Sequence, residues 1–327
     1  MPETILAIVI LAILFDISNG YNDAANAIAT VVSTRVLKPS QAVVLAVAMN
    51  VLGAFLTTAV AKTIGTGIVN PKAITHIVVI SALFAGFVWN TLMTIFGLPV
   101  SASHALIGGL IGASVSFGGM DVLNIPGITK ILLSLVLSPV LGIIFGFFFM
   151  NVLLGFCGAL PVSTVNKYFG KLQIISASFM AFSHGSNDAQ KVMGIITLSL
   201  VSGGFLHTVE VPFWVILTCA LAMGVGTAFG GWKVIKTMGM RMLKLEPVHG
   251  FAAETSATAV IIGASHWGLP VSTTHVIATA IMGVGATKRL TAVRWGIGKK
   301  IVNAWIFTLP ACAVFAWTIC TLLNLFV

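Results

Sequence analysis

Charged residues are scarce in this chain. They make up 8% of its 327 residues, whereas soluble domains carry about 25%. A soluble protein of this size would need a charged surface, so the composition excludes that class. Hydrophobic residues make up 58% of the chain and gather in long runs, several of which exceed the roughly 18 apolar residues that indicate a membrane-spanning helix. The runs are 4–15, 41–61, 131–156, 211–231 and 301–327.

Other absences narrow the class further. The apolar runs lack the alternation of polar and apolar residues that is typical of a transmembrane β-barrel, so we expect helices. The four cysteines have no metal-ligand or redox spacing and are interpreted as small buried hydrophobes. The first run has no basic segment before it, contains Asp16 and leads into a polar motif. We therefore expect no cleaved signal peptide.

Basic residues exceed acidic ones, and the formal net charge is +9. The lysines and arginines lie in short loops between hydrophobic runs. This distribution is typical of the cytoplasmic loops of a membrane protein, and we expect no nucleic-acid partner. The sequence predicts an integral protein of the inner or plasma membrane, in contact with the lipid bilayer.

Three short motifs occur twice, in the same order, at offsets of 165, 171 and 174 residues. An ordered set of matches indicates two homologous halves. We predict a first repeat over 1–156, a short cytoplasmic linker over 157–172 and a second repeat over 173–327. The pairs are GYNDA at 20–24 with GSNDA at 185–189, GLPVSASH at 97–104 with GLPVSTTH at 268–275, and KTIG at 62–65 with KTMG at 236–239.

The charge of equivalent loops changes between the halves. The loop with Arg35 and Lys38 is basic, whereas its counterpart, 203–210, has no Lys or Arg. Other second-half loops carry nine basic residues, and their counterparts carry only Lys62, Lys72 and Lys130. By the positive-inside rule, the halves are inverted and both termini face outside.

The predicted fold is an all-α polytopic membrane protein. It has two inverted-topology repeats, broken helices, re-entrant-type hairpins and about 10 to 12 membrane segments. Residues 3–34 would span about 48 Å as a straight helix, against a hydrocarbon core of about 30 Å. We therefore expect this crossing to break at Asn19 and Gly20. Residues 41–61 are expected to return across the membrane, and 73–118 to form a hairpin with its tip at 97–101.

The doubled Asn-Asp motif predicts a cation site. A carboxylate at the bilayer centre costs at least about 2.5 kcal/mol, so Asp23 and Asp188 need a partner, a proton or a bound cation. Oxygen ligands suit a hard cation such as Na⁺, and the two aspartates are the predicted Na⁺ ligands. Gly20 and Gly185 are expected to loosen their helices and expose backbone carbonyls. The full predicted site for Na⁺ or H⁺ is Asn22, Asp23, Asn26, Asn187 and Asp188.

The doubled GLPVS motif predicts an anion site. Gly and Pro end one helical segment, and the hydroxyl cluster then caps the next helix. A helix N-terminus offers free N–H groups and a positive dipole end. Two such termini that face each other near the membrane midplane favour a tetrahedral oxyanion. The predicted phosphate-binding residues are Ser101, Ser103, His104, Ser272, Thr273, Thr274 and Lys191.

At these motifs the chain resembles the inorganic phosphate transporter (PiT) family of cation–phosphate symporters. The resemblance rests on GYNDAANA at 20–27, both GLPVS segments and NAW at 303–305, and extends over nearly the whole chain. It implies an inverted-repeat helical bundle driven by Na⁺ or H⁺. It also implies that Asp23, Asn26 and Asp188 serve cation coupling, and that the hydroxyl clusters hold phosphate. No enzyme activity and no cofactor are expected.

Lys191 is a departure from the pattern, because it stands where the first copy of the motif has Asn26. The variant looks like the prokaryotic branch of the family, as does the lack of a long hydrophilic central loop. An ammonium group at this position could occupy the second, symmetric cation site or repel a cation from it.

Alternatives remain open at this stage. The cargo could be sulfate or another oxyanion, or the protein could be a channel. An intramembrane hydrolase using His184 and Ser186 is disfavoured, because residues two apart on a helix do not face each other and no GxSxG turn is present. The roles of Asp16, Glu254 and His275, the choice between Na⁺ and H⁺, the stoichiometry, metal–phosphate complexes as cargo, and assembly into a homo-oligomer stay undecided.

Overall fold

The computed structural model describes residues 3–69 and 74–326. Within these ranges the chain forms twelve α-helices and a single isolated β-bridge. Lys72 lies outside the described residues. The first six helices are α1 (Glu3–Ser33), α2 (Pro39–Gly53), α3 (Ala59–Gly67), α4 (His76–Phe96), α5 (Ala102–Gly118) and α6 (Ile125–Cys157). The next six are α7 (Val162–Ser202), α8 (Phe213–Phe229), α9 (Trp232–Lys236), α10 (Pro247–His266), α11 (Thr273–Lys288) and α12 (Trp295–Asn324).

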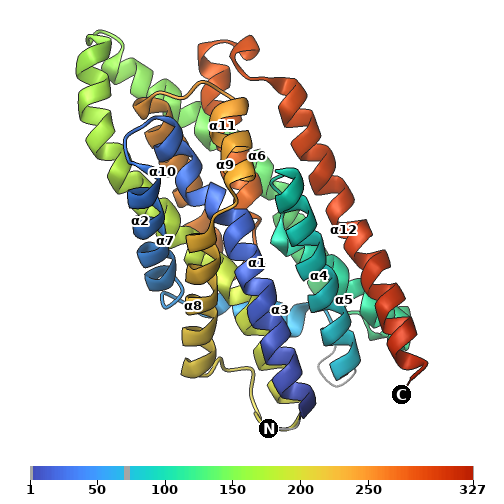
Figure 1. The fold of residues 1–327 in the computed structure, drawn as a ribbon. Helices are drawn as coiled ribbons and strands as arrows, with labels where there is room; N and C mark the ends of the chain where they lie inside the picture. Colours follow the sequence, from blue (N-terminus) through green and yellow to red (C-terminus); the bar gives the residue numbers. More distant parts are fainter. Residues whose placement is uncertain (1–2, 70–73, 327) are drawn as a thin grey trace.

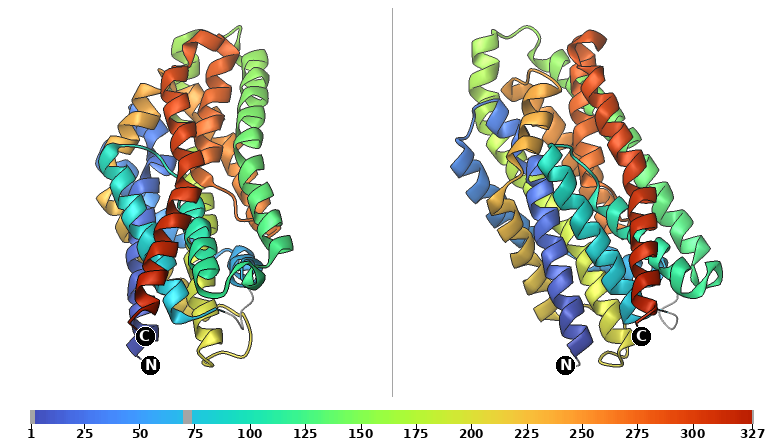
Figure 2. Two further views of the ribbon diagram at one scale, coloured as in Figure 1. Left: turned by 90° about the vertical axis from the view of Figure 1, so that its right-hand side faces the viewer. Right: turned by 45° about the vertical axis from the view of Figure 1, so that its right-hand side comes forward.

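Four of these helices, α1, α4, α6 and α12, are long and apolar enough to cross a membrane. A further crossing is bent by 65° between α8 and the segment Trp232–Arg241. Figure 2 shows α12 running along the length of the molecule. Large apolar side chains on α6 and α12 are exposed, among them Phe148, Ile306 and Phe307, as contact with lipid requires. The polytopic all-helical fold is as predicted.

The element order of the first six helices recurs in the last six, including a short helical turn before α6 and before α12 (Met120–Val122 and Leu290–Ala292). The helices α1 and α7 start from opposite ends of the molecule, and both termini lie at one end (Figure 1). Helix α7 begins at Val162, so only 158–161 separate it from α6 and most of the expected linker is helical. The residue boundaries of the repeats stay a prediction.

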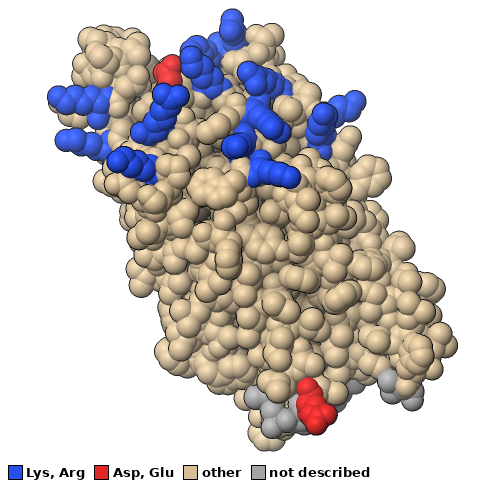
Figure 3. Space-filling model, viewed as in Figure 1, with Lys and Arg blue, Asp and Glu red and all other residues tan. Residues whose placement is uncertain are grey.

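Positive charge is concentrated at one end of the molecule. On the face shown in Figure 3, lysines and arginines gather at the end opposite the two termini. We call this the basic end, and the end that carries Glu3 and Phe326 the terminal end. In a membrane protein such an asymmetry reports orientation, because basic loops stay on the cytoplasmic side.

The predicted break at Asn19 and Gly20 is wrong, since α1 and α7 are both continuous through their Asn-Asp motifs. The motif side chains bond to other helices and leave the backbone ladder intact. The glycines allow close packing instead of loosening the helix. A Cβ at position 20 would lie 2.6 Å from the carbonyl oxygen of Met223, and one at position 185 would overlap the carbonyl oxygen of Asn50. Excess helix length can be accommodated by tilt.

A break does occur in the segment 41–61, which was expected to form one crossing. Helix α2 ends at Gly53 and α3 begins at Ala59. The buried side chain of Gln190 on α7 accepts hydrogen bonds from the backbone N–H groups of Val60 (2.8 Å) and Ala61 (3.3 Å). A new helix can therefore begin inside the protein, because its first-turn donors find an acceptor there.

The two predicted hairpins are present. Gly97 ends α4 with φ of 70°, and Gly268 follows α10 with φ of 65°, a backbone conformation that favours glycine. Ser101 caps α5 and Ser272 caps α11, each by accepting the backbone N–H three residues on at 3.2 Å. We call 97–101 and 268–272 the first and second hairpin tips.

Each tip is held from outside by a long helix. Trp305 on α12 donates to the carbonyl oxygen of Pro99 (2.9 Å), and Ser134 on α6 donates to that of Pro270 (2.9 Å). The two proline carbonyls and the two donors are each 171 residues apart, which is also the offset of the GLPVS motifs. The contacts fix the N-termini of α5 and α11 inside the bundle.

Candidate functional site

The two motif aspartates meet at the N-terminus of α11. Thr274 donates its hydroxyl to Asp23 Oδ1 (2.9 Å), and the adjacent Thr273 donates to Asp188 Oδ2 (2.8 Å). Both carboxylates are 1% exposed. Asp23 and Asp188, predicted for the cation, and Thr273 and Thr274, predicted for the anion, therefore lie together, and we call them the composite site.

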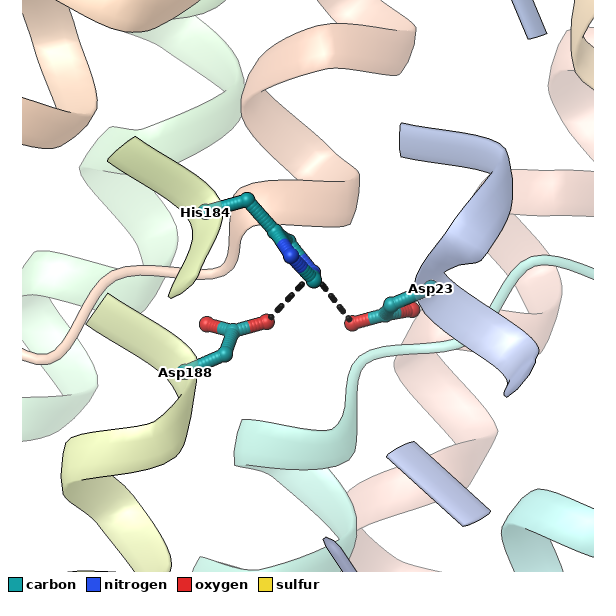
Figure 4. Close-up of side chains that lie close together, drawn as sticks. All are labelled: Asp23, His184 and Asp188. Carbon is teal, nitrogen blue, oxygen red and sulfur yellow. Dashed lines mark ion pairs between the residues drawn. The ribbon is translucent and has the colours of Figure 1, made fainter. Parts of the chain in front are cut away.

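His184 is a third member of this site. Its Nε2 atom lies 3.2 Å from Asp188 Oδ2 and 3.8 Å from Asp23 Oδ2 (Figure 4). Its Nδ1 atom lies 3.0 Å from Asn50 Oδ1 on α2. Sequence reasoning considered His184 only for a hydrolase and missed this position. The i, i+4 spacing from His184 to Asp188 was the available signal, because residues so spaced share a helix face.

Lys191 is buried in the same site, with 2% of its surface exposed. Its ammonium group forms an ion pair with Asp188 Oδ1 and donates to the carbonyl oxygen of Val271 at 3.0 Å. Lys191 therefore pairs with Asp188, and its predicted contact with phosphate stays a prediction. Asp188 thus has a lysine partner, whereas no lysine or arginine of the described residues pairs with Asp23.

The motif amides orient their N–H groups toward hydroxyls. Asn22 donates to Thr94 (2.7 Å) and Asn187 donates to Ser265 (2.8 Å), at equivalent places in the two halves. Asn26 donates to the hydroxyls of Thr274 (3.0 Å) and Thr273 (3.3 Å).

Two of these amides retain free acceptors. Within the described residues, the carbonyl oxygens of Asn26 and Asn187 are buried and have no donor. A bound cation is one group that would satisfy them, because buried polar oxygens otherwise find a donor.

The first turn of α5 touches the second hairpin tip. Ser103 donates to the carbonyl oxygen of Val271 at 3.3 Å, so the first turn of α5 lies against the second tip. The two helix N-termini are therefore adjacent, as the inverted arrangement predicts. Ser101 and Ser272 use their oxygens as helix caps, which leaves their hydroxyl hydrogens free to donate.

The two histidines that follow the tips form a separate pair. The rings of His104 and His275 lie 4.7 Å apart, and His275 stacks on Trp305 at 3.9 Å. Both rings line a surface cavity of about 430 Å³ between α6 and α12. In the described part of the chain no hydrogen bond joins either ring to the aspartates, and a phosphate contact of His104 stays a prediction.

Two further buried carboxylates differ in their surroundings. Glu254 on α10 accepts hydrogen bonds from Thr30 (2.5 Å), Gln173 (3.1 Å) and Ser176. It is 0% exposed, so Glu254 lies inside the bundle and not in a surface loop. Asp16 is also 0% exposed, yet neither of its oxygens has a donor in the described ranges.

This arrangement has the chemistry of an ion-binding site. It combines two carboxylates, an imidazole, an ammonium group, free amide oxygens and two helix N-termini in a region without exposed surface. The side chains that offer carboxylate and imidazole ligands lie within 4.8 Å of one another. The carboxylates that suit a cation thus lie next to the helix N-terminus that suits an anion, because Thr273 and Thr274 at the start of α11 bond to both aspartates.

Comparison with known proteins gives a consistent result. The chain is 44% identical over 324 residues to a protein of Bacillus subtilis named "probable low-affinity inorganic phosphate transporter", covering 98% of this chain and 97% of the relative. A Rhizobium meliloti protein of the same name is 43% identical over 312 residues, covering 95% and 93%.

A solved structure described as "the sodium-dependent phosphate transporter" matches with a TM-score of 0.88 and 27% identity, over 99% of this chain and 100% of that one. The model of the phosphate transporter family matches residues 19–316. This chain belongs to the phosphate transporter family, a family of membrane transporters and not of enzymes.

Proposed function

We propose that the protein carries inorganic phosphate across the membrane together with a monovalent cation. The observation that carries the proposal is the shared position of Thr273 and Thr274. They form the first turn of the α11 N-terminus, an anion-binding element, and their hydroxyls bond to the two carboxylates. Occupation of one site therefore changes the groups that form the other, which is the structural requirement for coupled transport.

Asp23 is the principal ligand of the coupling cation in this proposal. Among the described residues it has no ammonium partner. Asn26, whose carbonyl oxygen lacks a donor there, bonds to the same Thr274 hydroxyl as Asp23. A carboxylate and amide oxygens suit Na⁺, and the carboxylate alone suits H⁺. The name of the related solved structure favours Na⁺.

Asp188 is neutralised by Lys191 and contributes to the cation site through His184 and Thr273. The lysine ammonium then stands where a second cation would bind in a fully symmetric pair of sites. This arrangement supports one exchangeable cation at the two motifs, with Asp23 as its carboxylate ligand.

Phosphate is proposed to bind between the N-termini of α5 and α11. The first-turn N–H groups of a helix have no intrahelical partner, and the dipole end favours an anion. Ser101, Ser103 and Ser272 add hydroxyl donors beside these N–H groups, and Lys191 adds a positive charge. Phosphate can also donate a hydrogen bond to a carboxylate, which fully ionised sulfate cannot do.

The orientation follows from charge. Because the basic end carries the concentrated lysines and arginines (Figure 3), we propose that it faces the cytoplasm and that both termini face outside.

Uptake into proteoliposomes tests the function. Labelled phosphate should accumulate when an inward Na⁺ or proton gradient is imposed, uptake should saturate with phosphate, and sulfate should compete poorly. Accumulation without any cation gradient, or efficient competition by sulfate, would refute phosphate symport. A rate that does not saturate would indicate a channel.

A further inference from the structure

Asp16 is a buried carboxylate that the proposed site does not use. It lies on α1, seven residues before Asp23, and therefore about 10 Å nearer the terminal end. Both of its oxygens lack a donor among the described residues, and its exposure is 0%. An ionised carboxylate in such a place costs several kcal/mol unless a counter-charge neutralises it.

The next polar residue on the same helix face is Asn19. Its carbonyl oxygen is also buried without a donor in the described part of the chain. Asn19 is three residues after Asp16 and four before Asp23, and both spacings place side chains on one face of a helix. Asp16 and Asn19 thus lie on one stripe of α1 with Asp23, and among the described residues neither the Asp16 oxygens nor the Asn19 carbonyl oxygen accepts a geometrically complete hydrogen bond.

No described residue forms an ion pair with Asp16. Ala12, Phe15 and Cys219 belong to one apolar cluster, and the Asp16 carboxylate lies near Cys219. The charged groups that its carboxylate faces are Asp188, His184 and Lys191, and Cys219 is the titratable group on α8. His184 and Lys191 are themselves engaged with Asp188.

The same polar stripe of α1 continues toward the basic end, and its members differ in how they are hydrogen-bonded. Asp23 accepts from Thr274, and Thr30 at the basic-end side donates to Glu254. The polar file runs along α1 at spacings of three and four residues, through Asp16, Asn19, Asp23, Asn26 and Thr30. The carbonyl oxygen of Asn26 also lacks a donor among the described residues, but Asp16 differs from Asp23 in that neither of its carboxylate oxygens is hydrogen-bonded.

We propose that Asp16 and Asn19 form a second binding station for the coupling cation, on the terminal side of the Asp23–Asp188 site. The occupant is a monovalent cation, either Na⁺ ligated by the Asp16 carboxylate and the Asn19 carbonyl or a proton on Asp16. The proposal rests on the proposed cation coupling and adds a separate place where that cation binds. In the proposed orientation the station lies on the extracellular side.

The test uses purified full-length protein with Asp16→Asn, which keeps the side-chain size and removes the charge. Asp16→Glu is the second variant and retains a carboxylate. Ser18→Ala is the matched control, because Ser18 is equally buried on α1 and donates mainly to its own helix at Phe15. Phosphate uptake and thermal stability are measured as functions of Na⁺ concentration and pH.

Asp16→Asn should raise the half-saturating Na⁺ concentration about tenfold, as expected for loss of a charged ligand, or should remove one ionisation from the pH profile. Cation-dependent stabilisation of the protein should weaken in parallel. The Glu variant should retain most of the wild-type response, and Ser18→Ala should retain all of it. An effect of Na⁺ alone identifies the sodium ion as occupant, and an effect of pH alone identifies the proton.

If phosphate uptake and thermal stability of Asp16→Asn depend on Na⁺ and on pH as those of the wild type do, the proposed second cation site is wrong. Equal uptake and equal stability of the Asn and Glu variants would also overturn the proposal. A cation site needs the carboxylate that only the Glu variant keeps, whereas a packing role does not depend on that charge. If the wild type shows no cation-driven phosphate uptake, the proposed function itself fails, and that outcome is recognisable without any variant.

Discussion

Thr273 and Thr274 are neighbours in sequence whose hydroxyls serve two different carboxylates, one from each half of the chain. Consecutive residues of a first helical turn point in different directions, so this arrangement requires α1 and α7 to approach the N-terminus of α11 together. The pair therefore reports whether the composite site is assembled.

Replacement of Thr274 by valine removes the hydrogen bond that ties the Asp23 carboxylate to the N-terminus of α11, and should weaken phosphate binding there. A hydrogen bond to a charged group contributes about 1.5–3 kcal/mol, which corresponds to about one to two decades in affinity. Calorimetry in saturating cation measures the effect. Thr197→Val is the control, since Thr197 is equally buried and its hydroxyl has no partner in the described residues. Equal affinities of both variants would remove Thr274 from the site.

Lys191 gives a second prediction at this scale. Lys191→Asn, which restores the residue of the first motif, leaves Asp188 without its ion-pair partner. The vacated carboxylate should then require an exchangeable cation, and the cation dependence of phosphate uptake should become steeper. The exposed Lys62→Asn is the control. An unchanged dependence on Na⁺ and pH would show that Lys191 does not substitute for a cation.

Sequence reasoning identified the aspartates, amides and hydroxyls because their residue types are rare in apolar segments and occur twice. It missed His184 and Asn50, because the equivalent position in the other half of the chain holds a different type of residue in each case. Asn50 lies on α2 and reaches the site only through His184. A contact made between distant helices leaves no local pattern in sequence.

Within the helices, several glycines allow close packing against a neighbouring helix and do not break their own helix. A Cβ at Gly53 on α2 would overlap the backbone carbonyl of Phe182 on α7, and one at Gly226 on α8 would overlap that of Ile17 on α1. The two contacts occupy equivalent places in the two halves. Both hold a crossing helix against the one that carries an Asn-Asp motif.

Gly53→Ala should therefore destabilise the protein. Overpacking against backbone costs about 1–3 kcal/mol, because a carbonyl cannot move as a side-chain tip can. Thermal unfolding in detergent measures the change. Gly263→Ala on α10 is the matched control, since a Cβ there has no neighbour within 4 Å, and it should be neutral or slightly stabilising. Similar melting temperatures for the two variants would contradict the packing role.

The hairpins were predictable because Gly, Pro and Ser end and start helices by local chemistry. The positions of the helix breaks were not. A break at α2–α3 depends on Gln190, 130 residues away from Val60 along the chain, supplying an acceptor to a new helix. Hydrophobic length alone placed the break in α1, where the backbone ladder is in fact complete.

The molecule as a whole is polarised by charge, and this polarity predicts its orientation. With the four native cysteines replaced, an impermeant thiol reagent added to intact cells should label a cysteine at Glu3 and leave one at Arg241 or Arg289 unlabelled until the membrane is opened. All three side chains are exposed, so access depends on the side of the membrane. Labelling of 241 and 289 from outside would reverse the proposed orientation.

Coupling between the two ions is the central claim for the whole protein, and equilibrium binding tests it most directly. Phosphate affinity of the purified protein is measured across cation concentrations, and cation affinity across phosphate concentrations. Linkage requires the two affinities to rise by the same factor, and Asp23→Asn should abolish that factor without unfolding the protein. Phosphate affinity that is independent of the cation in the wild type would contradict a shared site at Asp23, Asp188 and the α11 N-terminus.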